Sequence, residues 1–182
     1  MFISNVQVAI GGKSKKGFLD GTFFSTPPPF FQTTYLNCKV GENTYPIAFA
    51  LLPNKLETTY REMLEKVKEV CEEQGVCLDF IYLHSDCEVA IINSVKAVFP
   101  NCQIRLCRFH IVDAIRRKAN ALGLRPIINR NDDFKAFYGR LREILNLPPH
   151  VWPQALDVVK GQLQPETKAI PAVQSFIEYT VS

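Results

Sequence analysis

The chain has 182 residues, of which 47% are hydrophobic and 21% are charged, and its formal net charge is +3. This composition is typical of a globular domain with a hydrophobic core and excludes an intrinsically disordered chain. No apolar run approaches the roughly 20 residues of a membrane helix, and the N-terminus lacks the features of a signal peptide. We therefore expect a nuclear or cytoplasmic protein without membrane association, in which the six cysteines are free thiols.

The first part of the chain alternates apolar runs with turn signals. Residues 17–24 and 31–40 are predicted strands, and the proline run at 27–29 separates them. A turn at Gly41 then leads into a third predicted strand at 45–52, so the last two strands should form an antiparallel hairpin.

Helices and strands alternate in the next part. The apolar spacing after Thr58, a candidate N-cap, predicts a helix that ends at Gly75. Four further elements are predicted, in the order strand 78–83, helix 87–99, strand 103–107 and helix 109–122. Strands that are separated by helices should be parallel, which predicts a mixed five-stranded sheet with helices on its faces.

The pattern becomes entirely helical after residue 125. A helix capped by Asp132 or Asp133 is predicted first, and helices at 151–160 and 169–180 follow. We therefore expect an α/β core over residues 1–124 and a helical insertion or appendage over residues 125–182.

Two aspartates stand at the carboxyl ends of predicted strands that should be neighbours. Asp20 precedes Gly21, and Asp86 follows the fourth strand. Taken singly, Asp20 fits a turn and Asp86 fits a helix cap. Taken together, two carboxylates at one sheet edge would repel each other unless a cation such as Mg²⁺ or Mn²⁺ lies between them. Glu88 could add a ligand, although a favourable position at the start of a helix also explains it.

A C-x-x-H step, Cys107 to His110, separates the last predicted strand from its helix. It suggests zinc, but a structural zinc site needs four ligands, and a buried thiol with a hydrogen-bonded histidine is the simpler interpretation. The segment from residue 105 to 130 has seven basic residues and one acid, Asp113. This segment is either a solvated face or a contact for phosphate groups of nucleic acid. The nucleic-acid-binding candidates in it are Arg105, Arg108, Arg116, Arg117 and Lys118.

The order of these motifs resembles the transposase domain of Mutator-like elements (MULE). The matching stretches begin with Asp-Gly-Thr-Phe at Asp20 and end with the C-x-x-H step. Between them lie Phe31-Gln32, residues 45–55, Thr59-Tyr60, residues 85–88 and residues 97–100. The resemblance implies a ribonuclease-H-like fold with an Asp-Asp-Glu metal site that cuts DNA at transposon ends and joins the 3′-hydroxyl to a target. It implies that Asp20 and Asp86 are the first two catalytic carboxylates, with Mg²⁺ or Mn²⁺ as cofactor.

The third carboxylate of the family has no match here. In this family the glutamate follows an Asn-rich stretch after the helical region, and Glu143, Glu166 and Glu178 do not fit that motif. We therefore expect a truncated or decayed transposase core. Three functions compete: a strand-transfer enzyme that is complete only in a longer chain, a non-catalytic remnant that binds DNA or protein, and a different nuclease that uses Glu178. The resemblance implies DNA as the partner, and a second copy of this chain is a further candidate partner.

Overall fold

The structure is a computed structural model that describes residues 1–181. The chain divides into two compact units, Met1–Cys107 and Arg108–Ser182. The division falls earlier than the expected boundary after residue 124, because helix α4 (Arg108–Ala121) contributes Ile115 and Ala119 to the core of the second unit.

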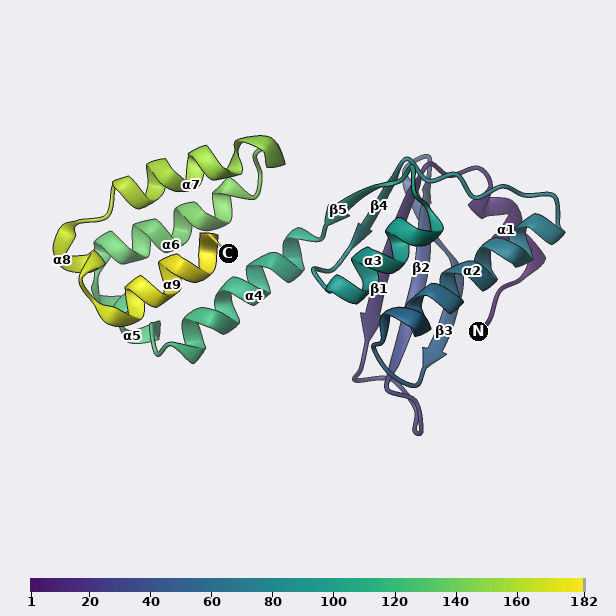
Figure 1. Cartoon of the computed structure of the whole chain (residues 1–182), viewed down its shortest axis with the longest axis horizontal. Coiled ribbons are helices and arrows are strands. Elements are labelled where there is room, and N and C mark those ends of the chain that lie inside the picture. Colours follow the sequence, from purple (N-terminus) through teal and green to yellow (C-terminus); the bar gives the residue numbers. More distant parts are fainter. Residues whose placement is uncertain (182) are drawn as a thin grey trace. The chain divides into compact units, whose positions relative to one another are not determined.

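The first unit is built on a mixed five-stranded sheet (Figure 1). Its strands are β1 (Lys16–Thr22), β2 (Gln32–Val40), β3 (Asn43–Leu52), β4 (Tyr82–Ser85) and β5 (Gln103–Leu106). The order across the sheet is β3-β2-β1-β4-β5. Strand β1 pairs antiparallel with β2 and parallel with β4, and β4 pairs parallel with β5. The predicted hairpin and the predicted neighbours β1 and β4 are therefore both confirmed, and the fold is ribonuclease-H-like.

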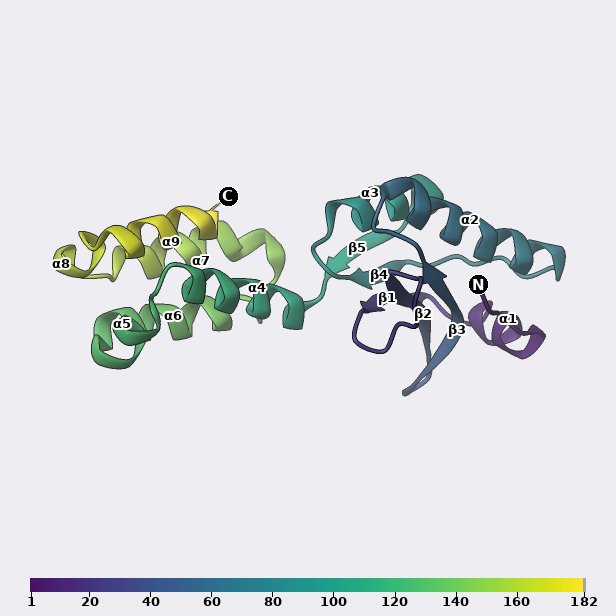
Figure 2. The ribbon, with the colours of Figure 1, turned by 90° about the horizontal axis from the view of Figure 1, so that it is seen from below.

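Two helices cover one face of this sheet, α2 (Glu57–Glu73) and α3 (Val89–Val98) (Figure 2). Leu19 of β1 and Leu83 of β4 are buried in the core of this unit, with Tyr60 and Leu64 of α2. The two helices are also tied to each other, because the Ser94 hydroxyl donates to the backbone carbonyl of Glu57 at 2.8 Å.

The N-terminal segment adds structure that the sequence analysis did not predict. A short helix, α1 (Asn5–Gly11), starts at a capping box between Ser4 and Gln7 and lies beside β3. Before it, Phe2 forms an isolated antiparallel bridge with Phe49 of β3. The Phe2 N–H donates to the Phe49 carbonyl at 2.8 Å, and the reverse bond measures 3.1 Å.

Some predicted element ends are wrong. Helix α2 begins after Leu56, not at Thr58, and the Asn54 side chain accepts the Leu56 N–H at 3.0 Å. The fourth strand covers only Tyr82–Ser85, because the apolar residues before it are buried in the connection from α2 and do not join the ladder.

The second unit is helical throughout its described residues, as predicted. It comprises α4, α5 (Arg125–Arg130), α6 (Asp132–Ile144), a 3₁₀ turn η1 (Pro149–Val151), α7 (Trp152–Gly161), α8 (Pro165–Lys168) and α9 (Pro171–Val181). Asn131, rather than Asp132 or Asp133, caps α6 by accepting the Phe134 N–H at 2.9 Å. The core of this unit is centred on Phe134, Phe137 and Phe176. None of the described helices is long and apolar enough to cross a membrane.

Candidate active site

The parallel register of β1 and β4 brings the two predicted aspartates to the same end of the sheet. Phe18 is paired with His84, and the two strands run in the same direction. Asp20 lies two residues beyond Phe18, and Asp86 lies two residues beyond His84, just after β4 ends. The register thus places the two carboxylates at equivalent positions on neighbouring strands, which are about 4.8 Å apart in a sheet.

Asp86 is held in a tight turn between β4 and α3. Its carboxylate oxygen Oδ1 accepts the backbone N–H of Glu88 at 3.0 Å. This bond from the residue two positions later is an Asx turn, and because Glu88 is the N-cap of α3, the expectation that Asp86 itself caps this helix is wrong. Asp20 is exposed, and its Oδ1 accepts the N–H of Gly21 at 2.9 Å.

Glu88 occupies the N-cap position of α3, one residue before the first helical turn. Its side chain makes no cap hydrogen bond and points instead to two other groups. Lys55 Nζ lies 3.0 Å from Glu88 Oε2, and the Tyr60 hydroxyl donates to Glu88 Oε1 at 3.4 Å. The carboxylate of Glu88 is therefore engaged by a cation and a phenol beside Asp86.

A buried polar chain supports this end of the sheet from the side of α2. Gln32 Nε2 donates to the Tyr60 hydroxyl oxygen at 2.6 Å and to Thr34 Oγ1 at 3.0 Å. Burial raises the pKa of Tyr60 well above its usual value. The hydrogen bond from Gln32 opposes this shift, and the negative charges of Glu88 and Asp86 add to it. Tyr60 thus stays a neutral donor that connects β2, α2 and the start of α3.

A family comparison bears directly on this arrangement. The model of the MULE transposase domain matches residues 18–114, which is more than half of the chain and includes both aspartates. The chain belongs to the MULE transposase domain family. It matches no curated protein sequence at a significant level.

The MULE match also includes the C-x-x-H motif, whose two residues lie at the junction of the units. Cys107 is half-buried, and its N–H donates to the Ser85 carbonyl at 2.7 Å, which extends the pairing of β4 and β5 by one residue. His110 lies in the first turn of α4, with its ring 5.6 Å from that of Phe109. Neither contact requires zinc, and the role of the motif stays a prediction.

The basic candidates are divided between the two units. In the first unit, the Arg105 guanidinium lies 3.8 Å from the centre of the Tyr82 ring. In the second, Arg116 and Arg117 both contact Asp113, with Arg117 Nε at 3.1 Å. The hydrogen bond from Arg116 is the main reason that the pKa of Asp113 lies below its usual value.

The other two basic candidates also have partners in the second unit. Arg108 Nη2 donates to the Arg142 carbonyl at 3.3 Å, and Lys118 Nζ lies 5.1 Å from the Tyr179 ring centre. The arginines at 116 and 117 nevertheless expose 60% and 69% of their side chains, so they remain accessible to a ligand.

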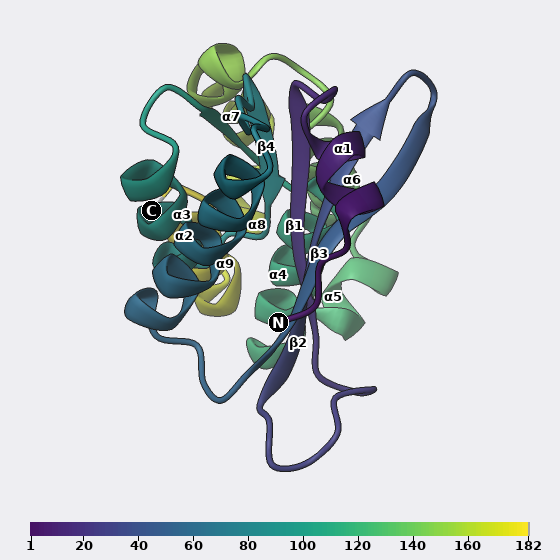
Figure 3. The same cartoon turned by 90° about the vertical axis from the view of Figure 1, so that its right-hand side faces the viewer.

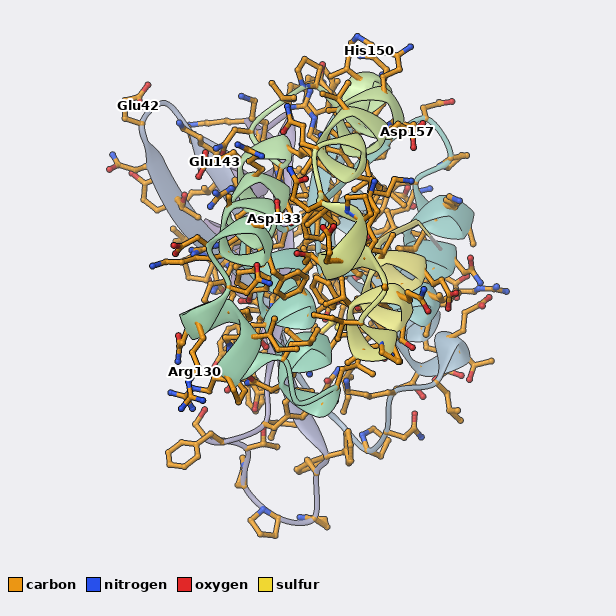
Figure 4. The ribbon with its side chains drawn as sticks, turned by 90° about the vertical axis from the view of Figure 1, so that its left-hand side faces the viewer. Glu42, Arg130, Asp133, Glu143, His150 and Asp157 are labelled. Atoms are coloured by element: carbon orange, nitrogen blue, oxygen red, sulfur yellow. The ribbon has the colours of Figure 1, made fainter. Side chains whose placement is uncertain are left out.

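The glutamates considered for the third carboxylate all lie on exposed parts of the second unit. Glu143 projects from α6 and accepts a 2.7 Å hydrogen bond from Asn146 (Figure 4). Glu166 lies in α8 and Glu178 in α9. The third ligand of a MULE-type site is not identified among these three.

The donor types at Asp20 and Asp86 fit magnesium or manganese. Magnesium is often bound through one or two carboxylates, with water and substrate phosphates completing its shell. Over residues 1–181, no group of three or more His, Cys, Asp or Glu side chains is arranged to hold a metal ion. Metal binding by Asp20 and Asp86 stays a prediction, in which water and substrate would supply the remaining positions.

Sequence reasoning did not assign roles to three residues beside the aspartates. In the sequence, Gln32, Lys55 and Tyr60 are notable only as members of the stretches that resemble the family. A signal for Gln32 does exist, because a glutamine within an apolar strand needs a buried hydrogen-bond partner. The sequence gives no indication that this partner is Tyr60, which lies 28 residues away on another element.

Proposed function

We propose that this chain is the DNA-cleaving part of a MULE transposase, in which Asp20 and Asp86 bind a divalent metal ion. The parallel pairing of β1 with β4 is the observation that carries the proposal, because it brings both aspartates to one end of the sheet within the family match. The expected reaction is hydrolysis of a phosphodiester at a transposon end, followed by joining of the free 3′-hydroxyl to target DNA.

The metal, when bound, would activate the attacking oxygen and stabilise the leaving oxygen. The chain itself would supply position and charge. The Glu88 N–H orients the Asp86 carboxylate. The Glu88 carboxylate forms an ion pair with Lys55, so it does not add an unpaired negative charge beside the aspartates. The Tyr60 hydroxyl adds a longer hydrogen bond of 3.4 Å to Glu88 from the buried side.

The test compares three asparagine variants of the full chain. Asp20→Asn and Asp86→Asn each remove a charge from the site, and the amide oxygen at position 86 can still accept the Glu88 N–H. Asp79→Asn is the matched control, because Asp79 is an exposed aspartate that pairs with Lys15 at 2.7 Å, near the start of β4. Mn²⁺ binding, measured by electron paramagnetic resonance, and Mn²⁺-dependent cleavage of duplex DNA are the two measurements.

We expect both measurements to be lost in Asp20→Asn and Asp86→Asn and kept in Asp79→Asn. Cleavage that survives both substitutions would show that another site or a contaminating nuclease is responsible. Mn²⁺ binding without any cleavage would favour the second candidate function.

That second candidate is a non-catalytic, transposon-derived protein that binds DNA through the helical unit. The charge distribution favours it: residues 108–182 contain eleven Lys and Arg and seven Asp and Glu, a net charge of +4, whereas residues 1–107 contain ten and eleven, a net charge of −1. Basic surfaces of this kind contact the DNA backbone independently of sequence.

Substitution of Arg116 and Arg117 by glutamine tests this contact. The logarithm of the binding constant falls linearly with the logarithm of the salt concentration, and each lost phosphate contact should make this slope shallower by about 0.9. Lys160→Gln is the control, because it removes a cation of the same unit that pairs with Asp157 at 2.8 Å. An unchanged salt dependence in the double variant would mean that these arginines only form a solvated face. A nuclear or cytoplasmic location and an oligomer of this chain stay predictions.

A further inference from the structure

The loop between β1 and β2 carries an unusual set of exposed aromatic rings. Residues 23–31 include four phenylalanines. Phe24 is fully exposed at 104%, and Phe23, Phe30 and Phe31 are exposed by 49%, 39% and 52%. Single exposed apolar side chains are ordinary, but several on one short loop mark a binding surface. Figure 3 shows the loop extending beyond the ends of β1 and β2.

Hydrogen bonds fix both ends of this loop. The Thr26 hydroxyl donates to the Thr22 carbonyl at 2.8 Å and lies 3.0 Å from the Thr33 hydroxyl. At the other end, the Phe31 N–H donates to the Leu52 carbonyl at 2.8 Å. The rings are therefore presented from an anchored loop, which lowers the entropy cost of binding a flat ligand.

The loop is connected to the end of the sheet where the aspartates lie. It starts three residues after Asp20. Lys55 Nζ lies 4.5 Å from the centre of the Phe23 ring, and the same ammonium group pairs with Glu88 at 3.0 Å. The Phe23 ring in turn packs edge-on against Phe31 at 5.7 Å. A ligand held at the aspartates would thus lie next to these rings.

We infer that this aromatic loop stacks on unpaired nucleobases of the DNA that is bound at Asp20 and Asp86. Base rings stack on aromatic side chains without sequence preference, and they are available for stacking only where the duplex is opened. Phe24 would be the principal contact because its ring is completely exposed. The inference rests on the proposed DNA-cleaving function and adds the state of the substrate, an opened rather than fully paired end.

Two other ligand classes are less consistent with this position. An anionic membrane surface would be repelled by the acidic residues Asp20, Asp86 and Glu88 at this end of the sheet. A protein partner would cover the rings but would not account for their place beside a pair of candidate metal ligands. Both alternatives are included as outcomes of the test.

The experiment measures DNA binding by the full chain in EDTA, so that no cleavage takes place. Fluorescence anisotropy compares a fully paired duplex with the same duplex carrying a central unpaired segment. Phe24→Ala removes the ring, and Phe24→Trp keeps a stacking surface. Tyr45→Ala is the matched control, because it removes a 37% exposed aromatic ring near the opposite end of the β2–β3 ladder.

We expect Phe24→Ala to weaken binding to the opened DNA by about 5- to 150-fold, the usual range for loss of one stacked base. Binding to the paired duplex should change by less than about twofold, since the ring has no unpaired base to contact there. Phe24→Trp and Tyr45→Ala should retain the wild-type preference. The thermal unfolding temperature should be unchanged in Phe24→Ala, because the ring is not packed in the fold.

An equal effect on both DNAs, or no effect on either, would overturn the inference. So would loss of binding to phosphatidylserine-containing vesicles in Phe24→Ala with DNA binding unchanged, which would assign the loop to an anionic lipid surface. Capture of a partner protein that depends on Phe24 while DNA binding does not would overturn it as well. The active-site proposal can fail independently of this inference. If Asp20→Asn still cleaves DNA while Phe24→Ala loses the preference for opened DNA, the proposed metal site is wrong and the stacking role of the loop is supported.

Discussion

Replacement of Tyr60 by phenylalanine should destabilise the first unit while leaving its shape unchanged. Tyr60 is fully buried, and its hydroxyl accepts a 2.6 Å hydrogen bond from Gln32 and donates a longer one of 3.4 Å to Glu88. Without the hydroxyl, one of the two Gln32 amide protons is left without this acceptor, whereas the other keeps its 3.0 Å bond to Thr34. A buried unsatisfied donor costs about 1–3 kcal/mol. We expect the free energy of unfolding to fall by about 1–2 kcal/mol. This decrease comes mainly from the lost Gln32 bond, because the longer bond to Glu88 contributes little.

The assay can follow each unit separately. Cys38 and Cys71 are both buried in the first unit, so thiol labelling in increasing urea reports its opening. Trp152, the only tryptophan, lies in the second unit, and its fluorescence reports that unit. With a urea dependence of about 1–3 kcal/mol per molar, the labelling midpoint should fall by roughly 0.3–2 M, and the fluorescence midpoint should not move.

Tyr45→Phe is the control, since it removes a hydroxyl from an exposed tyrosine of β3. A second variant sharpens the test: Gln32→Leu together with Tyr60→Phe removes donor and acceptor at once and should cost less than the sum of the two single changes. If Tyr60→Phe is as stable as the wild type, or if the two changes are strictly additive, the buried hydrogen bond does not hold this end of the sheet.

Three further predictions concern stability. Burial is the main cause that lowers the pKa of His84, and the charges of nearby cations lower it further. At a pH near 6.5 the unfolded chain therefore binds more protons than the folded chain, so the free energy of unfolding should fall as pH decreases through about 6.5. His84→Gln should flatten this pH dependence. Gly41 has φ +59°, so Gly41→Ala should lower the free energy of unfolding of the first unit by about 1 kcal/mol. Gly139 lies in open space within α6, so Gly139→Ala should raise the free energy of unfolding of the second unit by up to about 1 kcal/mol. Urea unfolding of each unit tests both signs. Asn131→Ala should lower the stability of the helical unit by about 1 kcal/mol, seen as an earlier Trp152 fluorescence transition, and an unchanged transition would show that the cap is not needed.

The sheet could be predicted from the sequence because its signals are local or topological. Alternating apolar runs located the strands, and the helices between the later strands predicted that these strands are parallel. The ends of elements were less predictable. Leu78 and Phe80 are as buried as strand residues, yet they precede β4, because an apolar run reports burial and not hydrogen-bond pairing. Helix α1 has only seven residues, too few for a clear helical period.

The site was predictable only in part. Asp20 and Asp86 were found because one lies near the carboxyl end of a strand, the other directly follows a strand, and the family motif contains both. The contacts that surround them join residues that are far apart in sequence: Lys55 and Glu88 are 33 residues apart, and Gln32 and Tyr60 are 28 apart. No local pattern encodes such pairs, because they form only after β2, α2 and α3 have packed.

The bridge between Phe2 and Phe49 has a practical consequence for handling the protein. Strand β3 is an outer strand of the sheet, and residue 2 occupies part of its free side through two backbone hydrogen bonds and a ring contact of 4.6 Å. Uncovered strands of this kind recruit further strands from other molecules and start aggregation. Removal of residues 1–3 would therefore be expected to lower solubility at high concentration, even though the candidate site lies on other strands.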